Sequence, residues 1–265
     1  MNVSQEEVRE NKSVAKNHVT TKYPGHSLLY KEAIQFYEEQ LNSINEVSGE
    51  DNIEVAGRLL LLQFCVICYQ DMKSIHTLLQ QREFLTPLIL LRHMIEFLFT
   101  WMYIEKDERE RATRFIANAF KEQSKLIDDL EKYGRVDDKL LATMKDRQRE
   151  NDTLYEQIVT NGGSLPSLRD RAREVGQLEM YDLIYRLLSK DSHPSSFNTG
   201  QFMTDLPDGR IKVHPYNRDR TAVALEQGLK ILNSLMAVLN RLFDLPQETK
   251  YRDLDVAIDT LSSGN

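Results

Sequence analysis

Arg186 and His193 are the residues in this 265-residue chain whose types and spacing best suit chemistry. They lie seven positions apart, close to two turns of an α-helix, so an unbroken helix places both on one face, about 10 Å apart along its axis. Pro194 disfavours helical geometry at the preceding residue, so we expect His193 at or just past the C-terminal end of that helix. An imidazole that titrates near neutral pH, beside a guanidinium, is suited to acid–base catalysis on a phosphate ester.

The same spacing has a structural alternative. His193 can cap the preceding helix through a backbone carbonyl, and Arg186 can form a surface ion pair. The sequence leaves both interpretations open. Tyr185, Ser189 and Ser192 lie in the same segment, and we predict that they line a ligand site there.

A second charged group, Arg92, His93 and Glu96, lies within the apolar stretch 85–104. Arg92 and Glu96 are one helical turn apart and can pair along the helix. Charges in such surroundings must be paired or serve a site. We therefore predict that Arg92, held by Glu96, binds an anion and that His93 lies beside it. The alternative is a buried salt bridge that fixes the helix in place. Arg169, Arg171 and Arg173 alternate with other residues and are expected to form a solvated face.

Helices must position these residues. Apolar residues recur every three or four positions through most of the chain, and glycine and proline are scarce, at 11 and 7 residues. The sequence predicts an all-α, single-domain, multi-helix bundle over 27–245, with a small loop or hairpin insertion near 194–216. Residues 1–26 are expected to form a flexible N-terminal arm, and 246–265 a peripheral C-terminal tail. The helices predicted within the bundle cover 28–47, 53–79, 86–104, 107–132, 138–160, a short stretch after Ser167, 178–189 and 219–243.

The composition excludes several classes of function. A net charge of −7 argues against broad DNA binding, which needs clustered positive charge. The charged group in 85–104 makes a membrane span costly, and the polar first 22 residues lack a secretory signal, so we predict a cytoplasmic protein. The two cysteines, Cys65 and Cys68, fit small core residues in a reducing compartment. No histidine has partners at metal-ligand spacing, and no nucleotide motif occurs, so we predict no metal and no cofactor.

Residues 91–96 (LRHMIE) and 185–195 (YRLLSKDSHPS) together resemble a bacterial helical family, domain-of-unknown-function family 5677, over roughly residues 30–240. That resemblance implies a helical fold and no particular activity. The spacing of Arg186 and His193 is also similar to that of the HEPN group, helical proteins of bacterial defence and toxin systems. Many of these are metal-independent ribonucleases that act as dimers with a shared cleft. The chain departs from the HEPN pattern at Leu187, where a polar residue is common, and at Pro194.

The HEPN resemblance implies a metal-independent ribonuclease of a phage-defence or toxin system, with RNA as substrate and a homodimer as its form. Arg186 would bind the scissile phosphate, and His193 would be the general acid or base. The alternative is a non-enzymatic helical module that binds a small anionic ligand or a protein partner. In that case Arg92–Glu96 is an internal strut and His193 a helix cap.

Overall fold

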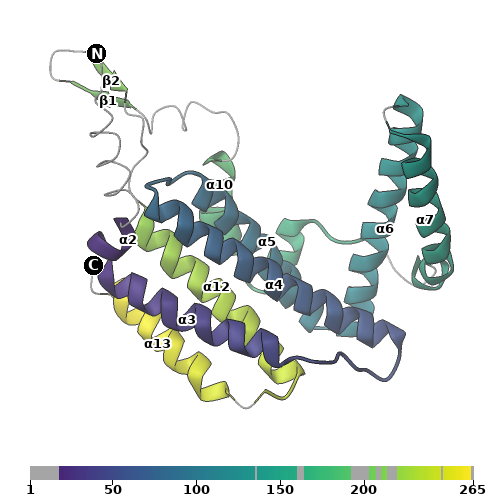
Figure 1. The fold of residues 1–265 in the computed structure, drawn as a ribbon, viewed down its shortest axis with the longest axis horizontal. Coiled ribbons are helices and arrows are strands. Elements are labelled where there is room, and N and C mark those ends of the chain that lie inside the picture. The colour runs from purple at the N-terminus through teal and green to yellow at the C-terminus, as the bar shows by residue number, and fades with distance from the viewer. Residues whose placement is uncertain are drawn as a thin grey trace.

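The computed structural model describes residues 18–134, 136–159, 164–191, 203–206, 210–213, 220–245 and 247–263. The described chain is almost wholly helical, which confirms the predicted all-α class (Figure 1). The helices are α2 (His18–Lys22), α3 (Pro24–Ser43), α4 (Asn52–Gln80), α5 (Thr86–Glu105), α6 (Glu108–Tyr133), α7 (Asp138–Val159), α8 (Leu168–Glu174), α9 (Leu178–Met180), the π-helix η1 (Tyr181–Tyr185), α10 (Arg186–Asp191), α12 (Thr221–Leu242) and α13 (Glu248–Ser263).

Local side-chain signals fix where several of these helices begin and end. The Asp51 carboxylate accepts hydrogen bonds from two backbone N–H groups in the first turn of α4, and Asp107 and Ser167 cap α6 and α8 in the same way. Gly134 ends α6 in the left-handed region, with a φ of 58° that favours glycine. These ends lie within a few residues of those that the sequence predicts.

At the centre of the bundle α4, α5 and α12 pack against one another, while α3 and α13 cover α12 (Figure 1). Burying apolar side chains is the main stabilising contribution to such a bundle. The Met72 side chain of α4 packs directly on Gly228 of α12, where an added Cβ atom would lie 2.6 Å from the Met72 sulfur. The fully buried side chains include Tyr37, Leu61, Met72, Ile75, Leu88, Leu91, Met94, Phe99, Trp101, Leu232 and Leu235.

By length and composition alone, α4, α5 and α12 are apolar enough to cross a membrane. More than half of the most apolar stretch of α5 and of α12 is buried within the bundle, against a third of that of α4.

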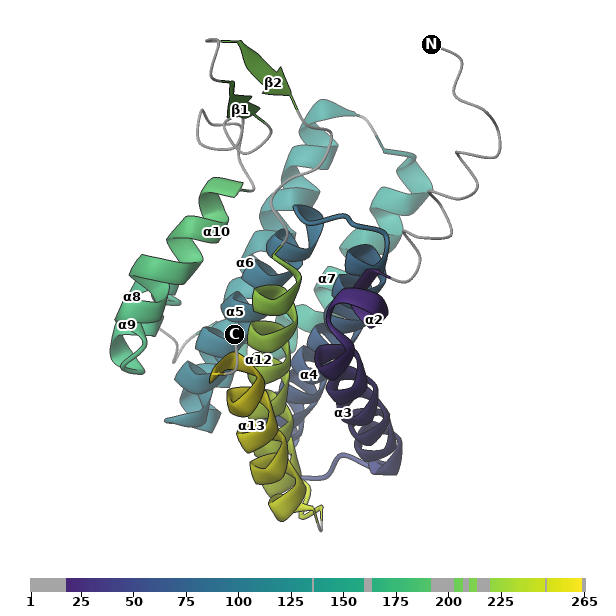
Figure 2. The ribbon, with the colours of Figure 1, turned by 90° about the vertical axis from the view of Figure 1, so that its left-hand side faces the viewer.

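Helices α6 and α7 form a hairpin that points away from the bundle (Figure 1). The chain then returns, and α8 and α10 pack against α5. In the view turned by 90°, α10 lies on the opposite side of the bundle from α3 (Figure 2). The predicted hairpin near 194–216 is present in the described part of that segment. Strands β1 (Met203–Asp205) and β2 (Ile211–Val213) pair antiparallel, with Met203 opposite Val213.

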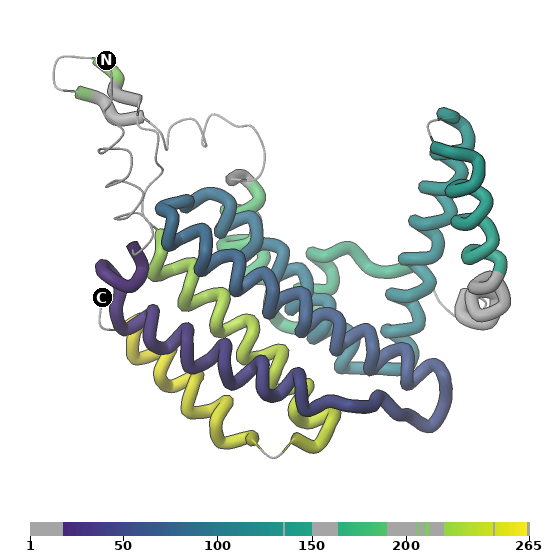
Figure 3. The backbone as a smooth tube through the Cα atoms, viewed as in Figure 1, coloured from purple at the N-terminus to yellow at the C-terminus, as the bar shows by residue number. Residues whose placement is uncertain are grey.

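Both predicted peripheral segments contain ordered helix. The expected arm, 1–26, includes α2 and the start of α3, where Val19 and His26 are buried. The expected tail, 246–265, also packs on the bundle. It contains α13, whose side chains Tyr251, Leu254 and Ile258 are buried against α12 and α3. The backbone trace shows α13 running alongside these two helices (Figure 3). Apolar residues three or four positions apart give α13 a face that is stable only when covered.

Candidate functional site

Arg92, Glu96 and Tyr185 form one closed group at the contact between α5 and η1. The Arg92 Nη2 atom lies 3.1 Å from the Glu96 carboxylate and donates a hydrogen bond of 3.0 Å to the Tyr185 hydroxyl. That hydroxyl in turn donates to Glu96 Oε1 at 2.7 Å. The Arg92 guanidinium also lies 5.1 Å from the centre of the Tyr185 ring, within cation–π range. Each member therefore bonds to both of the others.

The electrostatics of this group follow from partial burial and mutual contact. Burial raises the pKa of the Tyr185 hydroxyl, and its bond to Glu96 raises it further. Burial acts to lower the pKa of Arg92, but the contacts with Tyr185 and Glu96 outweigh it and leave the pKa raised. Arg92 is therefore held as a cation and Tyr185 as a neutral hydroxyl.

The turn that delivers Tyr185 is a π-helix of five residues, closed by a hydrogen bond from the Arg186 N–H group to the Tyr181 carbonyl. Single π-turns inside α-helices are rare and frequent at functional sites. Here Tyr185 is buried against α5, whereas the side chain of Arg186, the next residue, is 64% exposed. Tyr185 and Arg186, which are consecutive in the sequence, therefore face opposite sides. We call the side that faces α5 the inner side and the side that faces solvent the outer side.

On the outer side, Asp182 lies between two arginines. Its carboxylate is 3.8 Å from Arg186 and 3.4 Å from Arg169. Within the described ranges Arg186 has no other ion pair. The three residues carry a net charge of +1, and the long separation leaves the Arg186 guanidinium available to an added anion. The structure does not place Arg186 in the Arg92 group.

The remaining predicted residues divide into three cases. Ser189 lies one turn beyond Tyr185 and donates a hydrogen bond of 2.9 Å to its carbonyl. His93 is not part of the Arg92 group, because its Nδ1 atom lies 2.7 Å from the Asp71 carboxylate on α4. Ser192 and His193 lie outside the described residues.

Arg171 on α8 is the residue that the sequence interpretation missed. It was expected on a solvated face, but it donates a hydrogen bond of 2.5 Å to the Thr100 hydroxyl on α5. Burial lowers its pKa, and the neighbouring Glu96 only partly offsets this. In the part of the chain that the structure describes, Arg171 has no ion pair and its Nε atom has no hydrogen-bond partner. The alternation of arginines with other residues in 169–173 could not predict this burial, because α5, which carries Thr100, is remote in the sequence.

Among the described residues, no three His, Cys, Asp or Glu side chains gather as metal ligands would. Cys65 and Cys68 are both buried and free, and burial raises the pKa of both thiols. Neither thiol is suited to act as a nucleophile.

One comparison with known proteins gives a match. The sequence model described as "Family of unknown function (DUF5677)" matches residues 58–210, more than half of the 265-residue chain. The matched region runs from α4 through β1 and includes every predicted site residue. No curated protein and no solved structure matches the chain.

Proposed function

The chain belongs to the DUF5677 family, and from that premise we propose that the outer side of α10 binds RNA phosphate and that the protein is a metal-independent ribonuclease. The observation that supports this most is the exposed Arg186 guanidinium, held loosely by Asp182 at the start of the helix that leads to His193. A guanidinium that is not committed to a close carboxylate can bind a phosphate oxygen. Arg186 would bind the scissile phosphate and stabilise the charge that develops on it.

In this proposal His193 is the general acid or base, a role that suits an imidazole seven positions after Arg186 in the sequence. The resemblance to the HEPN group adds that two copies share the cleft and that the protein acts in the bacterial cytoplasm in defence. The role proposed for Arg92 and Glu96 differs from the anion binding that the sequence predicted. They position Tyr185, and through it the helix that carries Arg186, rather than bind the ligand themselves.

The second candidate is a helical module that binds an anionic ligand without cleaving it. The closed Arg92–Glu96–Tyr185 group supports this alternative, because all three side chains bond to one another as in an internal strut. In that case RNA or a smaller anion would bind at Arg186 and remain intact.

The test is incubation of the purified protein, with a chelator present, against single-stranded RNA and transfer RNA. The wild type is expected to cleave, and both His193→Ala and Arg186→Ala should reduce the rate by about a hundredfold or more. Arg169→Ala is the matched control, because Arg169 shares Asp182 but lies on α8. Cleavage that survives in His193→Ala overturns the mechanism. Binding without cleavage by the folded wild type selects the second candidate.

A further inference from the structure

Helix α4 has an outer face that the rest of the described chain leaves partly uncovered. Only 33% of its most apolar stretch is buried, against 61% for the corresponding stretches of α5 and α12. In Figure 1 α4 runs across the front of the bundle, and no described helix passes in front of it. Three large apolar side chains of α4 are 38–40% exposed, namely Leu59, Val66 and Ile67. Apolar residues gathered in this way on one helix indicate an interaction surface.

Helical spacing places most of these residues in one row. Val55, Leu59, Leu62 and Val66 are separated by four, three and four positions, and Val55 and Leu62 are half-buried. Residues at this spacing form the stripe along which one helix packs on another. Residues 59–70 contain no charged side chain. The outer face of α4 is therefore suited to packing against a further helix.

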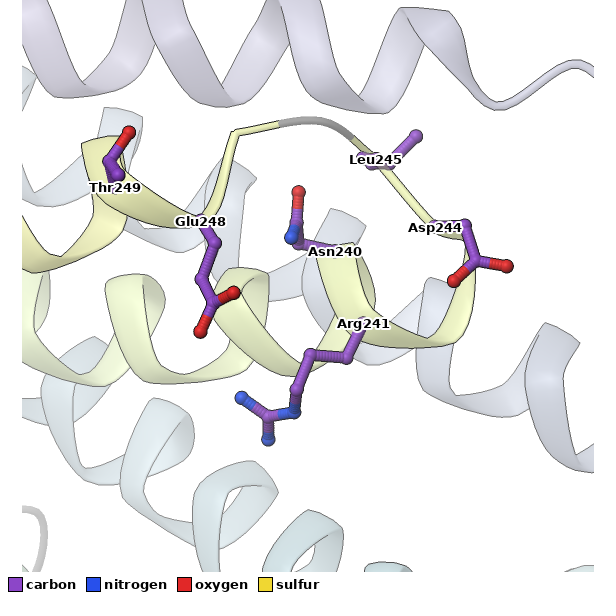
Figure 4. Close-up of a pocket in the computed structure, with 6 residues that line it drawn as sticks. All are labelled: Asn240, Arg241, Asp244, Leu245, Glu248 and Thr249. Atoms are coloured by element: carbon purple, nitrogen blue, oxygen red, sulfur yellow. The ribbon is translucent and has the colours of Figure 1, made fainter.

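The hollow at the turn between α12 and α13 has the opposite character. Its two carboxylates, Asp244 and Glu248, point apart in Figure 4, and Asn240 points in a third direction. Leu245 is apolar, and the other lining residues are polar, namely Asn240, Arg241, Asp244, Glu248 and Thr249. A lining of this kind provides little apolar area, so a partner gains more from the outer face of α4.

A lipid surface and a protein are the two kinds of partner that an apolar helix face can meet. Helices that lie on membranes usually carry several Lys or Arg residues beside the apolar face, which attract anionic lipids. Residues 52–77 contain two such cations, Arg58 and Lys73, and Arg58 is already paired with Glu54 at 2.6 Å. The chain as a whole has a net charge of −7. These charges favour a protein partner.

The charged residues near the two ends of the face favour a second copy of the same chain. Lys73 lies near the C-terminal end of the face, and the exposed Glu50 lies just before its N-terminal end. In an antiparallel pair about a two-fold axis at Leu62, positions equally far from Leu62 in the two copies lie opposite each other. Lys73 of each copy then comes next to Glu50 of the other. A parallel pair would instead place like charges side by side.

We propose that the outer face of α4 binds the same face of a second copy, antiparallel and centred near Leu62. The apolar row of each helix fits between the side chains of the other, and pairs of Lys73 with Glu50 close both ends. Gln63 lies beside the axis, where its carboxamide can bond to its counterpart. This contact differs from the cleft of the proposed ribonuclease, because α10, which begins at Arg186, packs on α5.

The test is disulfide cross-linking of the full-length Gln63→Cys variant under mild oxidation. Gln63 is exposed and one position from the proposed axis, so the introduced thiols of the two copies come within reach of each other. The native Cys65 and Cys68 are both buried and do not compete. We expect most of the variant to become a covalent dimer. The matched control is Thr77→Cys, exposed on the same face but about 45 Å from its counterpart along the helix axes, which should not cross-link.

Sedimentation equilibrium measures the strength of the pair without oxidation, with melting temperatures recorded to confirm folding. Val66→Glu should weaken dimerisation by about a hundredfold, because it places a charge in the apolar row. Lys73→Glu should weaken it by about tenfold, and adding Glu50→Lys restores the opposite charges and should recover most of that loss. Val256→Glu, at a 62% exposed position on α13, is the control and should associate as the wild type does.

Four results would overturn the proposal. The folded wild type could stay monomeric at micromolar concentration, or Thr77→Cys could cross-link as readily as Gln63→Cys. A dimer that survives Val66→Glu would have its interface elsewhere on the chain. Binding of the wild type to vesicles of phosphatidylglycerol, lost in Val66→Glu, would assign the face to a lipid surface instead. None of these measurements depends on cleavage of RNA, so the proposed ribonuclease is tested separately.

Discussion

On each side of the η1–α10 segment an arginine lies near a carboxylate, but the two pairs are in opposite circumstances. On the inner side Arg92, Glu96 and Tyr185 bond to one another at 2.7–3.1 Å. On the outer side Arg186 lies 3.8 Å from Asp182, with most of its side chain in solvent. Close, partly buried contacts contribute to stability, whereas loose surface pairs contribute little. The difference supports separate tasks for the two arginines, with Arg92 stabilising the fold and, in the proposed function, Arg186 binding a ligand.

The largest effect is expected from Glu96→Gln on the inner side. The change leaves two guanidinium groups, Arg92 and Arg171, without their nearby carboxylate. Breaking a fully buried pair costs roughly 3–5 kcal/mol, and partial exposure here reduces the expected loss of unfolding free energy to about 2 kcal/mol. Urea denaturation measures it. Glu122→Gln, in an exposed pair with Lys125, is the control and should cost less than about 0.5 kcal/mol. Equal losses of unfolding free energy in Glu96→Gln and Glu122→Gln would show that the inner group stabilises the fold no more than an exposed ion pair does.

Tyr185→Phe should have the next largest effect. It keeps the ring over Arg92 but removes the hydroxyl that links Arg92 and Glu96. We expect a loss of about 1 kcal/mol in unfolding free energy, because two hydrogen bonds disappear while the Arg92–Glu96 pair remains. The comparison variant is Tyr133→Phe, whose residue is 64% exposed at the end of α6. A thermal melt of Tyr185→Phe identical to the wild type would show that the hydroxyl link carries no stability.

Arg171→Met is expected to gain a small amount of stability, about 0.5 kcal/mol. The guanidinium is half-buried with a hydroxyl partner and no ion pair in the described ranges, so its desolvation is poorly compensated. Methionine keeps much of the length and fits irregular gaps. Arg173→Met, at an exposed position on the same helix, should leave the melting temperature unchanged. A clear loss of stability in Arg171→Met would mean that Arg171 belongs to the inner group as a structural cation.

The smallest effect on stability is expected from Arg186→Ala. The pair with Asp182 is long and exposed, so the unfolding free energy should change by less than about 0.5 kcal/mol. Chemical denaturation alongside Glu96→Gln gives the comparison directly. A loss as large as that of Glu96→Gln would place Arg186 among the stabilising residues and contradict its assignment to the outer side.

Much of the fold could be predicted from the sequence, because helical periodicity and end signals such as Asp51 and Gly134 are local. The contact of Arg92 with Glu96 was predictable for the same reason, since one turn separates them. The contact of Tyr185 with these two residues was not predictable, because Tyr185 lies 89 positions after Glu96 in the sequence and only the packing of η1 on α5 brings them together.

Two packing contacts could not be predicted, for related reasons. The spacing of Tyr251, Leu254 and Ile258 carried a helical signal, but nothing local showed that α12 and α3 would cover that face. For Arg171, an alternating charge pattern is typical of a solvated helix, and burial depends on where α8 meets Thr100 of α5. In both cases long-range packing determined the outcome, and no short pattern encodes it.

The most direct test of the separation between the two sides is the RNA affinity of Arg186→Ala, measured by fluorescence anisotropy with a labelled single-stranded RNA. The melting temperature is recorded on the same sample. We predict a loss of affinity of about tenfold or more at a melting temperature equal to that of the wild type. Wild-type affinity in the folded Arg186→Ala variant would contradict the assignment of Arg186 to a ligand.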